Sequence, residues 1–344
     1  MITHDLEENE EIYQYQPLWN KWTIDGLIGT GSFGKVFRVS YQEYGHVYLS
    51  AVKIISIPSA VPGAAAPPVE GADEITLKSY FHEMVQSLIN EVDILYSLSG
   101  NSNILGYHDH MIIEHKNKVG WDILIRMEYV KPLSQYLVEK QLTLEEIITL
   151  GIDICTALDI CKKRGIIHRD IKDKNIFIND DGIFKLGDFG IAILAGGLNA
   201  TMGGTPEYMA PEVYHHEKYH AAVDIYSLGI VMYKLLNHGR LPGMPPYPAK
   251  IQDSDGQSAL AKRMTGDSFR APDQAGEALA KVIMKACAYQ PDKRYSSPQK
   301  MKTALSSVLK KLPEDARKHA VTMIPSDQKK NSAQPQTLYS PQRI

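Results

Sequence analysis

The alternation of apolar and polar residues predicts two structural regions, the first of them a β-rich unit. Residues 22–54 tend to alternate and are punctuated by glycine, which predicts short antiparallel strands. Residues 57–71 are rich in Pro, Ala and Gly and are predicted to form an exposed connection. Apolar residues at helical spacing predict a helix over residues 78–97, followed by strands at 104–108 and 123–129.

The pattern changes to long helices at residues 128–133, which marks a boundary between two lobes. Thr143 and Glu146 have the spacing of a capping box at the start of a helix. Residues 225–236 are apolar on almost every side, as in a helix buried inside a lobe. A Ser-Pro pair at residue 297 predicts the start of the last helix.

These features divide the chain into an extension, a folded domain and a tail. The predicted parts are an acidic N-terminal extension (1–19), a folded domain (20–311) made of a small lobe (20–127), a hinge (128–133) and a large lobe (134–311), and a polar tail (312–344). The tail has almost no apolar residues to bury, so we expect it to be disordered.

Composition excludes several classes of protein. The 344 residues carry 37 Lys+Arg and 40 Asp+Glu, a net charge of −3, so there is no broad basic surface and we expect no nucleic-acid partner. The cysteines are odd in number and far apart, without zinc-site spacing, which favours a reducing cytoplasmic location: Cys155, Cys161 and Cys287. No apolar run reaches the roughly 18 residues of a membrane span, so we expect no membrane segment within this chain; an anchor outside it stays open.

Three glycines between two predicted strands are the first chemical signal. Gly29, Gly31 and Gly34 would let backbone N–H groups approach a phosphate without an intervening Cβ. A plain glycine-containing hairpin explains this short motif equally well. The residues after Gly34 resemble a strand and not a helix, which disfavours a dinucleotide-binding turn.

Several further motifs follow in a recognisable order. They are AVK ending at Lys53, HRDIKDKN at 168–175, DFG at 188–190, GTPEYMAPE at 204–212, DIYSLG at 224–229, and Arg294. Together they resemble the protein kinase family over about residues 22–311, and their shared order makes coincidence negligible. The resemblance implies an α+β, two-lobed protein kinase domain over residues 20–311. Its small antiparallel β lobe would carry one main helix, and its larger lobe would be mostly helical.

The resemblance also implies catalytic roles. Phosphoryl transfer requires a held triphosphate, magnesium ions and an aligned hydroxyl group, and the protein does little covalent work. Asp170 would accept or orient the proton of the attacking hydroxyl, Lys172 would steady the γ-phosphate, and Lys53 would contact the α- and β-phosphates. Asp188 and Asn175 would bind Mg²⁺ through hard oxygen ligands.

ATP with Mg²⁺ is therefore the cofactor set that the resemblance implies. Glu91 is the expected partner of Lys53, because residues 90–95 resemble the corresponding family segment, and Glu83 is the alternative. The other implied nucleotide contacts are Ile28, Gly29, Gly31 and Gly34 near the phosphates, Val36 and Ala51 above the adenine, Phe177 below it, Met127 behind it, and Glu128 and Val130 through their backbones.

Other matched positions are structural in the family. The implied contacts are a stack of Leu95, His168 and Phe189, an anchor from Asp224 to the catalytic loop, and a buried ion pair between Glu212 and Arg294. Asp173 and Tyr226 stand where proline and tryptophan are common, but neither departure removes a catalytic atom.

Thr201 is the candidate phosphorylation site. It lies four residues before Thr205, at the position that the family usually phosphorylates, although most threonines in such loops have no role. Arg169 would receive the phosphate through charge-assisted hydrogen bonds, which would order the loop. Autophosphorylation between two molecules would need a transient homodimer.

The resemblance thus predicts a serine/threonine protein kinase that acts on Ser or Thr hydroxyls of protein substrates. Lys172 and the Gly-Thr-Pro-Glu segment at 204–207 resemble the serine/threonine branch and not the tyrosine branch. A pseudokinase that only binds partners and a small-molecule kinase are the two alternatives. The second is disfavoured by the segment at 204–212. The proline-rich segment 239–251 resembles an insertion in bacterial kinases and favours a bacterial source, although a stiff surface loop explains it as well.

Overall fold

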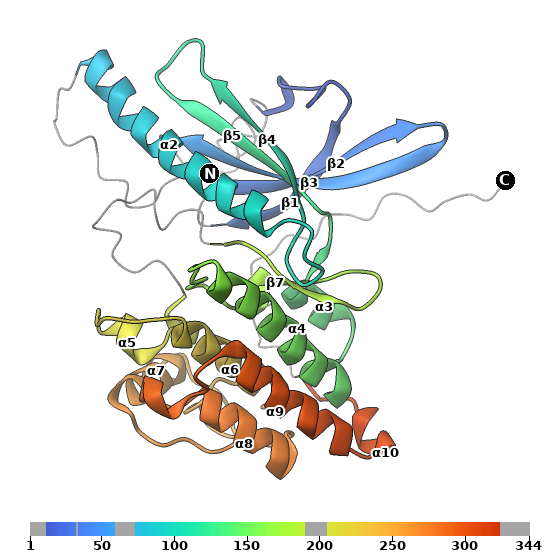
Figure 1. The fold of residues 1–344 in the computed structure, drawn as a ribbon, viewed down its shortest axis with the longest axis vertical. Coiled ribbons are helices and arrows are strands. Elements are labelled where there is room, and N and C mark those ends of the chain that lie inside the picture. Colours follow the sequence, from blue (N-terminus) through green and yellow to red (C-terminus); the bar gives the residue numbers. More distant parts are fainter. Residues whose placement is uncertain (1–11, 32–33, 59–72, 190–204, 324–344) are drawn as a thin grey trace.

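A sheet lies over a bundle of helices, as Figure 1 shows. The computed structural model describes residues 12–31, 34–58, 73–189 and 205–323. The part with the five-stranded sheet also carries helix α2, and the other part is mainly helical. This arrangement confirms the two-lobed α+β fold that the sequence predicts.

The sheet of the small lobe is antiparallel throughout. Its strands, in the order β1-β2-β3-β5-β4, are β1 (Thr23–Gly31), β2 (Gly34–Glu43), β3 (His46–Ile57), β4 (Tyr107–Glu114) and β5 (Trp121–Met127). The strand predicted at 104–108 is wrong in position, since β4 begins at Tyr107. Ile104 is apolar for another reason: it is buried and forms a bridge with Leu186 of the large lobe.

The two faces of the sheet are covered by different segments. Phe37, Val52 and Leu124 pack in one cluster with Ile12 and Leu18 from the start of the described chain. Residues 12–19, which the sequence assigns to an acidic extension, therefore contribute to the core of the small lobe. The opposite face carries a second cluster in which the sheet packs against α2 (Glu74–Leu98), with members Ile55, Ile57, Ile123, Ile125, Phe81, Val85 and Leu88.

Helix α2 begins earlier than its apolar spacing predicts and is tied to the large lobe at its other end. The Asp73 side chain caps it by accepting a hydrogen bond of 2.8 Å from the Thr76 amide. Beyond the helix, the Leu105 amide donates to the Leu186 carbonyl and the Leu186 amide donates to the Asn103 carbonyl, both at 2.9 Å. These backbone bonds join the end of α2 to the sheet of the large lobe.

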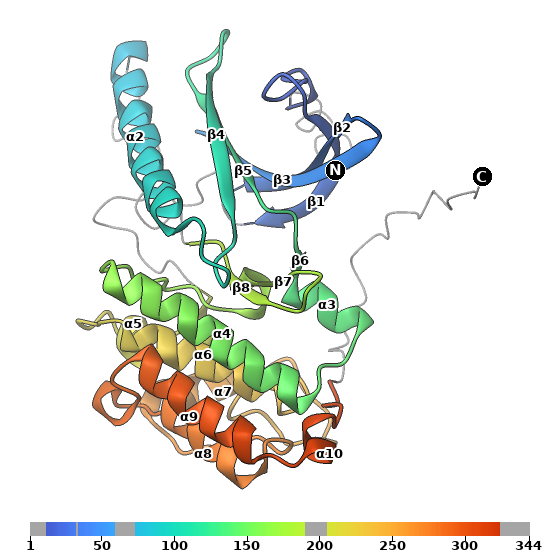
Figure 2. The same cartoon turned by 45° about the vertical axis from the view of Figure 1, so that its right-hand side comes forward.

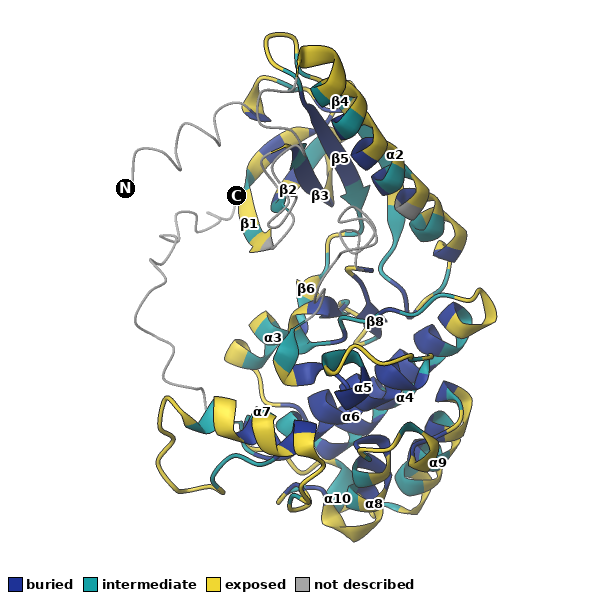
Figure 3. Cartoon of the chain, turned by 90° about the vertical axis from the view of Figure 1, so that its left-hand side faces the viewer, coloured by how far each residue is buried: buried dark blue, intermediate teal, exposed yellow. Residues whose placement is uncertain are grey.

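The large lobe is built around α6, which is buried on almost every side (Figure 3). Its described helices are α3 (Leu133–Glu139), α4 (Leu144–Lys163), α5 (Pro211–Tyr214), α6 (Ala222–Leu235), α7 (Asp255–Thr265), α8 (Gly276–Ala286), α9 (Pro298–Lys311) and α10 (Glu314–Arg317). The predicted capping box of α4 is confirmed: the Glu146 amide donates to Thr143 Oγ1, and the Thr143 amide donates to Glu146 Oε2.

A small sheet lies between the two lobes, below the large sheet in Figure 2. Its strands are β6 (Lys131–Pro132), β7 (Ile176–Ile178) and β8 (Phe184–Leu186). Short 3₁₀ turns occur at Asp173–Asn175, Pro206–Tyr208 and Pro291–Lys293. The first two of these turns flank the catalytic-loop residues described below.

The packed chain continues past residue 311, where the sequence places the start of the tail. Val321 is buried, and its amide donates to the Leu142 carbonyl at 2.8 Å. The His319 carbonyl accepts a hydrogen bond from the Leu144 amide at 3.0 Å. The segment up to Met323 thus lies against the start of α4. Within the described part of the chain, no helix combines the length and apolarity needed to cross a bilayer.

Candidate active site

Four predicted nucleotide contacts lie on one face of the large sheet. Ala51 and Lys53 are two residues apart on β3 and so point to the same side. Val36 of β2 is the cross-strand partner of Lys53, and Met127 of β5 is the partner of Ala51. The strand register therefore places these side chains together on one face of the sheet. Another part of the same face packs against α2.

The glycines differ in how much room the structure leaves for a side chain. At Gly34 an added Cβ would lie 2.1 Å from the Ile54 carbonyl oxygen, so glycine is required there by the contact with β3. At Gly29 the nearest atom would be 4.0 Å from such a Cβ, so the position has room. Gly31 pairs with Gly34 where the two strands meet, and the Ile28 side chain is 48% exposed. The close contact with β3 therefore explains the glycine at position 34, and no phosphate contact is needed to account for it.

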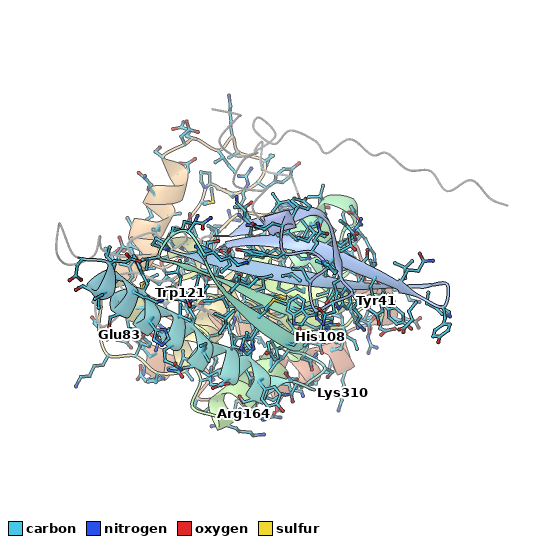
Figure 4. All side chains as sticks on the ribbon, turned by 90° about the horizontal axis from the view of Figure 1, so that it is seen from above. Tyr41, Glu83, His108, Trp121, Arg164 and Lys310 are labelled. Carbon is cyan, nitrogen blue, oxygen red and sulfur yellow. The ribbon has the colours of Figure 1, made fainter. Side chains whose placement is uncertain are left out.

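Lys53 connects the sheet to the large lobe. Its side chain is buried, and its Nζ forms an ion pair with Asp188 Oδ1. Desolvation opposes ionisation of Asp188, but the charge of Lys53 holds the pKa of this carboxyl below its ordinary value. The side chain of Glu91 lies outside the described part of the structure. Glu83 is exposed on α2, at the far end of the small lobe from Tyr41 when viewed from above (Figure 4).

The Asp170 carboxylate is held by four donor groups from three residues. Its Oδ2 accepts hydrogen bonds from Lys172 Nζ at 2.7 Å and Asn175 Nδ2 at 2.9 Å. Its Oδ1 accepts from the amide and the hydroxyl of Thr205, both at 3.2 Å. Lys172 Nζ also donates to Thr205 Oγ1 at 2.8 Å. The structure therefore joins the catalytic loop to the segment that begins at Thr205.

Asp224 anchors this loop from α6, as the resemblance implies. Its two carboxylate oxygens accept hydrogen bonds of 2.9 Å from the amides of His168 and Arg169. Burial raises the pKa of Asp224 above its ordinary value and outweighs the contribution of these bonds. The His168 and Phe189 rings lie 4.8 Å apart, and Leu95 packs against the cores of both lobes. The predicted anchor is confirmed, and so is the contact between His168 and Phe189 in the predicted stack.

Two residues at the site have backbone angles that disfavour any side chain. Arg169 has a φ of 68° and Asp188 has a φ of 55°, and neither residue is glycine. Such left-handed conformations cost about 1–3 kcal/mol each and persist where the surroundings impose them. The Asp224 bond to the Arg169 amide and the Lys53 ion pair supply that restraint.

Asn175 and Asp188 have oxygen atoms suited to a magnesium ion. Asn175 is buried, and its Nδ2 donates to both the carbonyl and the carboxylate of Asp170. This use of Nδ2 leaves the amide oxygen of Asn175 as an acceptor. Asp188 uses Oδ1 for Lys53, and its Oδ2 has no hydrogen-bond partner among the residues described. One amide oxygen and one carboxylate oxygen are hard ligands of the kind that Mg²⁺ prefers.

The hinge carries backbone groups that could bind a base. The Glu128 amide donates to the Gly106 carbonyl at 2.7 Å, and Glu128 Oε2 accepts from Lys185 Nζ at 2.9 Å. Within the described chain, no hydrogen bond uses the Glu128 carbonyl or the Val130 amide. Phe177 is the cross-strand partner of Lys185 on the small sheet between the lobes. Glu128 is thus fixed by its neighbours, whereas the Glu128 carbonyl and the Val130 amide have no hydrogen-bond partner in the described chain.

A polar triad that the sequence analysis missed links three segments of the large lobe. Lys234 of α6 donates to Asp173 Oδ2 and to the Tyr208 hydroxyl, both at 2.8 Å, and that hydroxyl donates to Asp173 Oδ1 at 3.2 Å. Burial raises the pKa of Tyr208 to about 12, so the phenol is neutral. The only sequence signal was aspartate at position 173, where proline is common. The triad ties the catalytic loop to the Pro206–Tyr208 turn.

The predicted ion pair between Glu212 and Arg294 is confirmed. Two hydrogen bonds of 2.7 Å join the two side chains, which are 5% and 0% exposed. The Arg294 guanidinium carbon also lies 4.8 Å from the centre of the Tyr226 ring. The remaining hydrogen bonds of Arg294 go to the backbone carbonyls of Ala222, Ala288 and Tyr289. This buried guanidinium is fully satisfied.

Thr201 lies outside the described residues, so its surroundings are not assigned. Its expected phosphate receptor, Arg169, lies 5.5 Å from the Tyr219 ring. The Nε atom of Arg169 is buried and has no hydrogen-bond partner within the described ranges. An N–H group is therefore left at the position where the resemblance expects a phosphate contact.

Comparison with known proteins identifies the family. The protein kinase domain family matches residues 22–306. The chain belongs to the protein kinase family. A Dictyostelium discoideum protein named probable serine/threonine-protein kinase nek2 is 32% identical over 277 residues, covering 77% of this chain and 57% of that protein. The Aurora kinase of Saccharomyces cerevisiae is 25% identical over 292 residues, covering 84% of this chain and 70% of that protein.

This kinase chain matches only part of some relatives. It spans 57% of the nek2 protein and 20% of a second Dictyostelium relative, named probable serine/threonine-protein kinase nek3, which is 33% identical over 251 residues and covers 64% of this chain.

Proposed function

We propose that this kinase transfers the γ-phosphate of ATP to serine and threonine hydroxyls of proteins. The observation that carries the proposal is the Asp170 carboxylate, which is bonded to Lys172, Asn175 and Thr205. A carboxylate fixed in this way suits the orientation of an acceptor hydroxyl and the acceptance of its proton. Relatives whose names give them as probable serine/threonine-protein kinases support the same substrate class.

Nucleotide binding would use the open face of the large sheet. Lys53 would contact the α- and β-phosphates, and the Glu128 carbonyl and Val130 amide would bond the adenine. Val36 and Ala51 would cover the base from the sheet side. Register on the sheet supports this arrangement, since it places Val36, Ala51 and Lys53 on one face.

Magnesium would be held by Asp188 and Asn175, and it would supply charge neutralisation for the phosphates. Because Lys53 is paired directly with Asp188, ATP binding would exchange part of this ion pair for phosphate contacts. The buried amine keeps an anionic partner in either state.

The serine/threonine preference rests on a contact between two of the matched motifs. Lys172 and Thr205 resemble the serine/threonine branch of the family, and they are hydrogen-bonded to each other beside Asp170. Their position supports a role in placing an acceptor side chain.

The test is transfer from labelled ATP. The purified chain is incubated with γ-labelled ATP and Mg²⁺, and acceptor sites are mapped by mass spectrometry, with a chelator as the control. We expect label on serine and threonine of proteins. ATP binding without any transfer would instead support the pseudokinase alternative, and label on a small molecule would support the small-molecule kinase.

We also propose autophosphorylation of Thr201 between two molecules. The Nε of Arg169 has no hydrogen-bond partner among the described residues, which supports the proposal, since a phosphate could gain charge-assisted hydrogen bonds there. Thr201→Ala should slow transfer while ATP affinity is unchanged, whereas Thr303→Ala, at an exposed threonine on α9, should have no effect. A second-order dependence on enzyme concentration would identify a transient homodimer. An unmodified Thr201 in fully active enzyme would contradict the proposal.

A reducing, cytoplasmic compartment suits the cysteines. Cys155, Cys161 and Cys287 are free and buried. Burial raises the pKa of Cys161 and Cys287 to about 12, so both are thiols at neutral pH. Thiols in this state do not readily form disulfides.

A further inference from the structure

A pocket of about 180 Å³ lies in the large lobe between α6, α7 and the end of α8, away from the Asp170 site. Its lining includes Tyr226, Arg263, Phe269, Met284, Cys287 and Tyr289. The volume is well above the roughly 10–15 Å³ that one water molecule needs. The side chains are mostly aromatic or apolar, with one permanently charged group among them.

That charged group, Arg263, is buried without a counterion. Its exposed fraction is 2%, and its Nη2 donates to the Glu207 carbonyl at 2.8 Å. Its Nε and Nη1 have no hydrogen bond of good geometry in the described chain. The Tyr226 hydroxyl interacts with the guanidinium but is neutral, and no carboxylate in the described chain forms an ion pair with Arg263. Arg294, equally buried, has both a carboxylate and three carbonyls. The described part of the large lobe therefore supplies a counterion and a full set of hydrogen-bond acceptors for Arg294, but not for Arg263.

None of the groups that line the pocket forms an ion pair with Arg263. Burial raises the pKa of both Tyr226 and Cys287 to about 12, so both are neutral at pH 7. Asp267 also lines the pocket, but it is exposed and has no ion pair with Arg263. An unpaired charge in the interior is strongly unfavourable, so an anion in the pocket would relieve a real deficit.

We propose that this pocket binds a small carboxylate with an apolar body. The carboxylate would accept charge-assisted hydrogen bonds from Arg263, which are stronger than neutral ones. The apolar body would contact Phe269 and Met284. This inference concerns a second site and goes beyond the proposed transfer reaction.

Arg263 connects the pocket to the Pro206–Tyr208 turn. The Glu207 carbonyl that Arg263 holds belongs to the Pro206–Tyr208 turn, and this turn directly follows Thr205, which bonds Asp170. A ligand that fixes the guanidinium would therefore also restrain the turn. Slower amide hydrogen exchange in residues 205–209 is the expected consequence.

Benzoate is the probe, with benzyl alcohol as its neutral match, and calorimetry and NMR on the full chain give the affinities. Arg263→Met should bind benzoate at least about tenfold more weakly, equivalent to about 1.4 kcal/mol. Lys262→Met, the same change at the exposed neighbour, should bind like the parent. Benzyl alcohol should bind weakly to all three. No binding of benzoate to the parent, or equal affinity in Arg263→Met, would overturn the proposal.

Because Arg263→Met also removes the hydrogen bond to the Glu207 carbonyl, a second variant that keeps Arg263 is needed. Ser268→Trp adds bulk at an exposed position of the lining and keeps Arg263. It should reduce benzoate binding and the hydrogen-exchange effect together, and undiminished binding would contradict the assignment. Binding and exchange need no phosphoryl transfer, so an inactive enzyme would not affect this result.

Discussion

The proposed catalytic loop and the sheet face proposed to bind the nucleotide fix their side chains in different ways. Both Asp170 oxygens accept hydrogen bonds, and the amides before Asp170 are held by a buried carboxylate from α6. On the sheet, register sets the direction of Val36 and Ala51, and Lys53 has one ion pair. Ile28 at the edge is half exposed.

The difference follows from what each region must do. An attacking hydroxyl needs alignment, since small displacements are expensive in rate, and a buried helix supplies it. In the proposed reaction β1 and β2 would cover the phosphates and would have to admit and release a nucleotide, so fewer fixed contacts suit them. The structure therefore predicts that variants in the large lobe damage transfer through geometry, whereas sheet variants damage nucleotide binding.

Asp188→Asn should have the largest effect, because Asp188 belongs to both regions. The neutral amide is a poor magnesium ligand and leaves the buried Lys53 without its counterion. We expect transfer to be abolished while circular dichroism shows a retained fold. Asp180→Asn, the same change on an exposed turn, should leave the rate unchanged. Full activity in Asp188→Asn would remove the link between the two regions.

Arg294→Ala should have the next largest effect and tests the rigidity of the large lobe. Removing one partner of a buried ion pair costs about 3–5 kcal/mol, since Glu212 keeps an uncompensated charge. Urea unfolding measures the loss, and Lys293→Ala, at an exposed neighbour, should stay within about 0.5 kcal/mol of the parent. If the two variants unfold alike, the pair does not stabilise the lobe that holds the catalytic loop.

Thr205→Ala tests how strongly the fixed position of Asp170 contributes to transfer. It removes a hydroxyl that bonds both Asp170 and Lys172, and hydrogen bonds to charged groups contribute about 1.5–3 kcal/mol. Steady-state kinetics should show a fall in kcat of about 10- to 100-fold with little change in KM for ATP. Thr205→Ser should restore most of the rate. A rise in the KM for ATP alone would assign Thr205 to the nucleotide side.

Tyr208→Phe should have the smallest effect. It removes one hydroxyl from the triad but keeps the bond between Lys234 and Asp173, so the expected loss of stability is about 0.5–1.5 kcal/mol. Thermal unfolding measures it, with Tyr13→Phe, at an exposed tyrosine, as the control. A loss equal to that of Arg294→Ala would show that the triad is a main support of the loop.

Local signals in the sequence predicted helices well. The α4 capping box depends on residues three positions apart, and α6 is apolar on almost every side, so both could be recognised without tertiary information. Strand β4 was misplaced because Ile104 is buried against Leu186, a contact that spacing does not reveal. The packing of Val321 on the start of α4 was missed for the same reason.

The site was predictable only in part. Its motif residues follow from the family resemblance, which also implied the ion pair between Glu212 and Arg294 despite their distance in sequence. Lys234 was not predicted, because a lysine near the end of a helix usually reaches solvent, and only the fold brings it to Asp173. The incomplete hydrogen bonding of Arg263 is equally invisible before its burial is known.

The most direct test of the division between the two regions is Asp170→Asn, with MgATP affinity and transfer rate measured on the same sample. Asp170 lies in the fixed loop and has no contact with Val36, Ala51 or Lys53 among the described hydrogen bonds and ion pairs. We expect unchanged MgATP affinity and a transfer rate lowered by about 10²–10⁴-fold. Retained transfer, or an affinity that falls together with the rate, would contradict it.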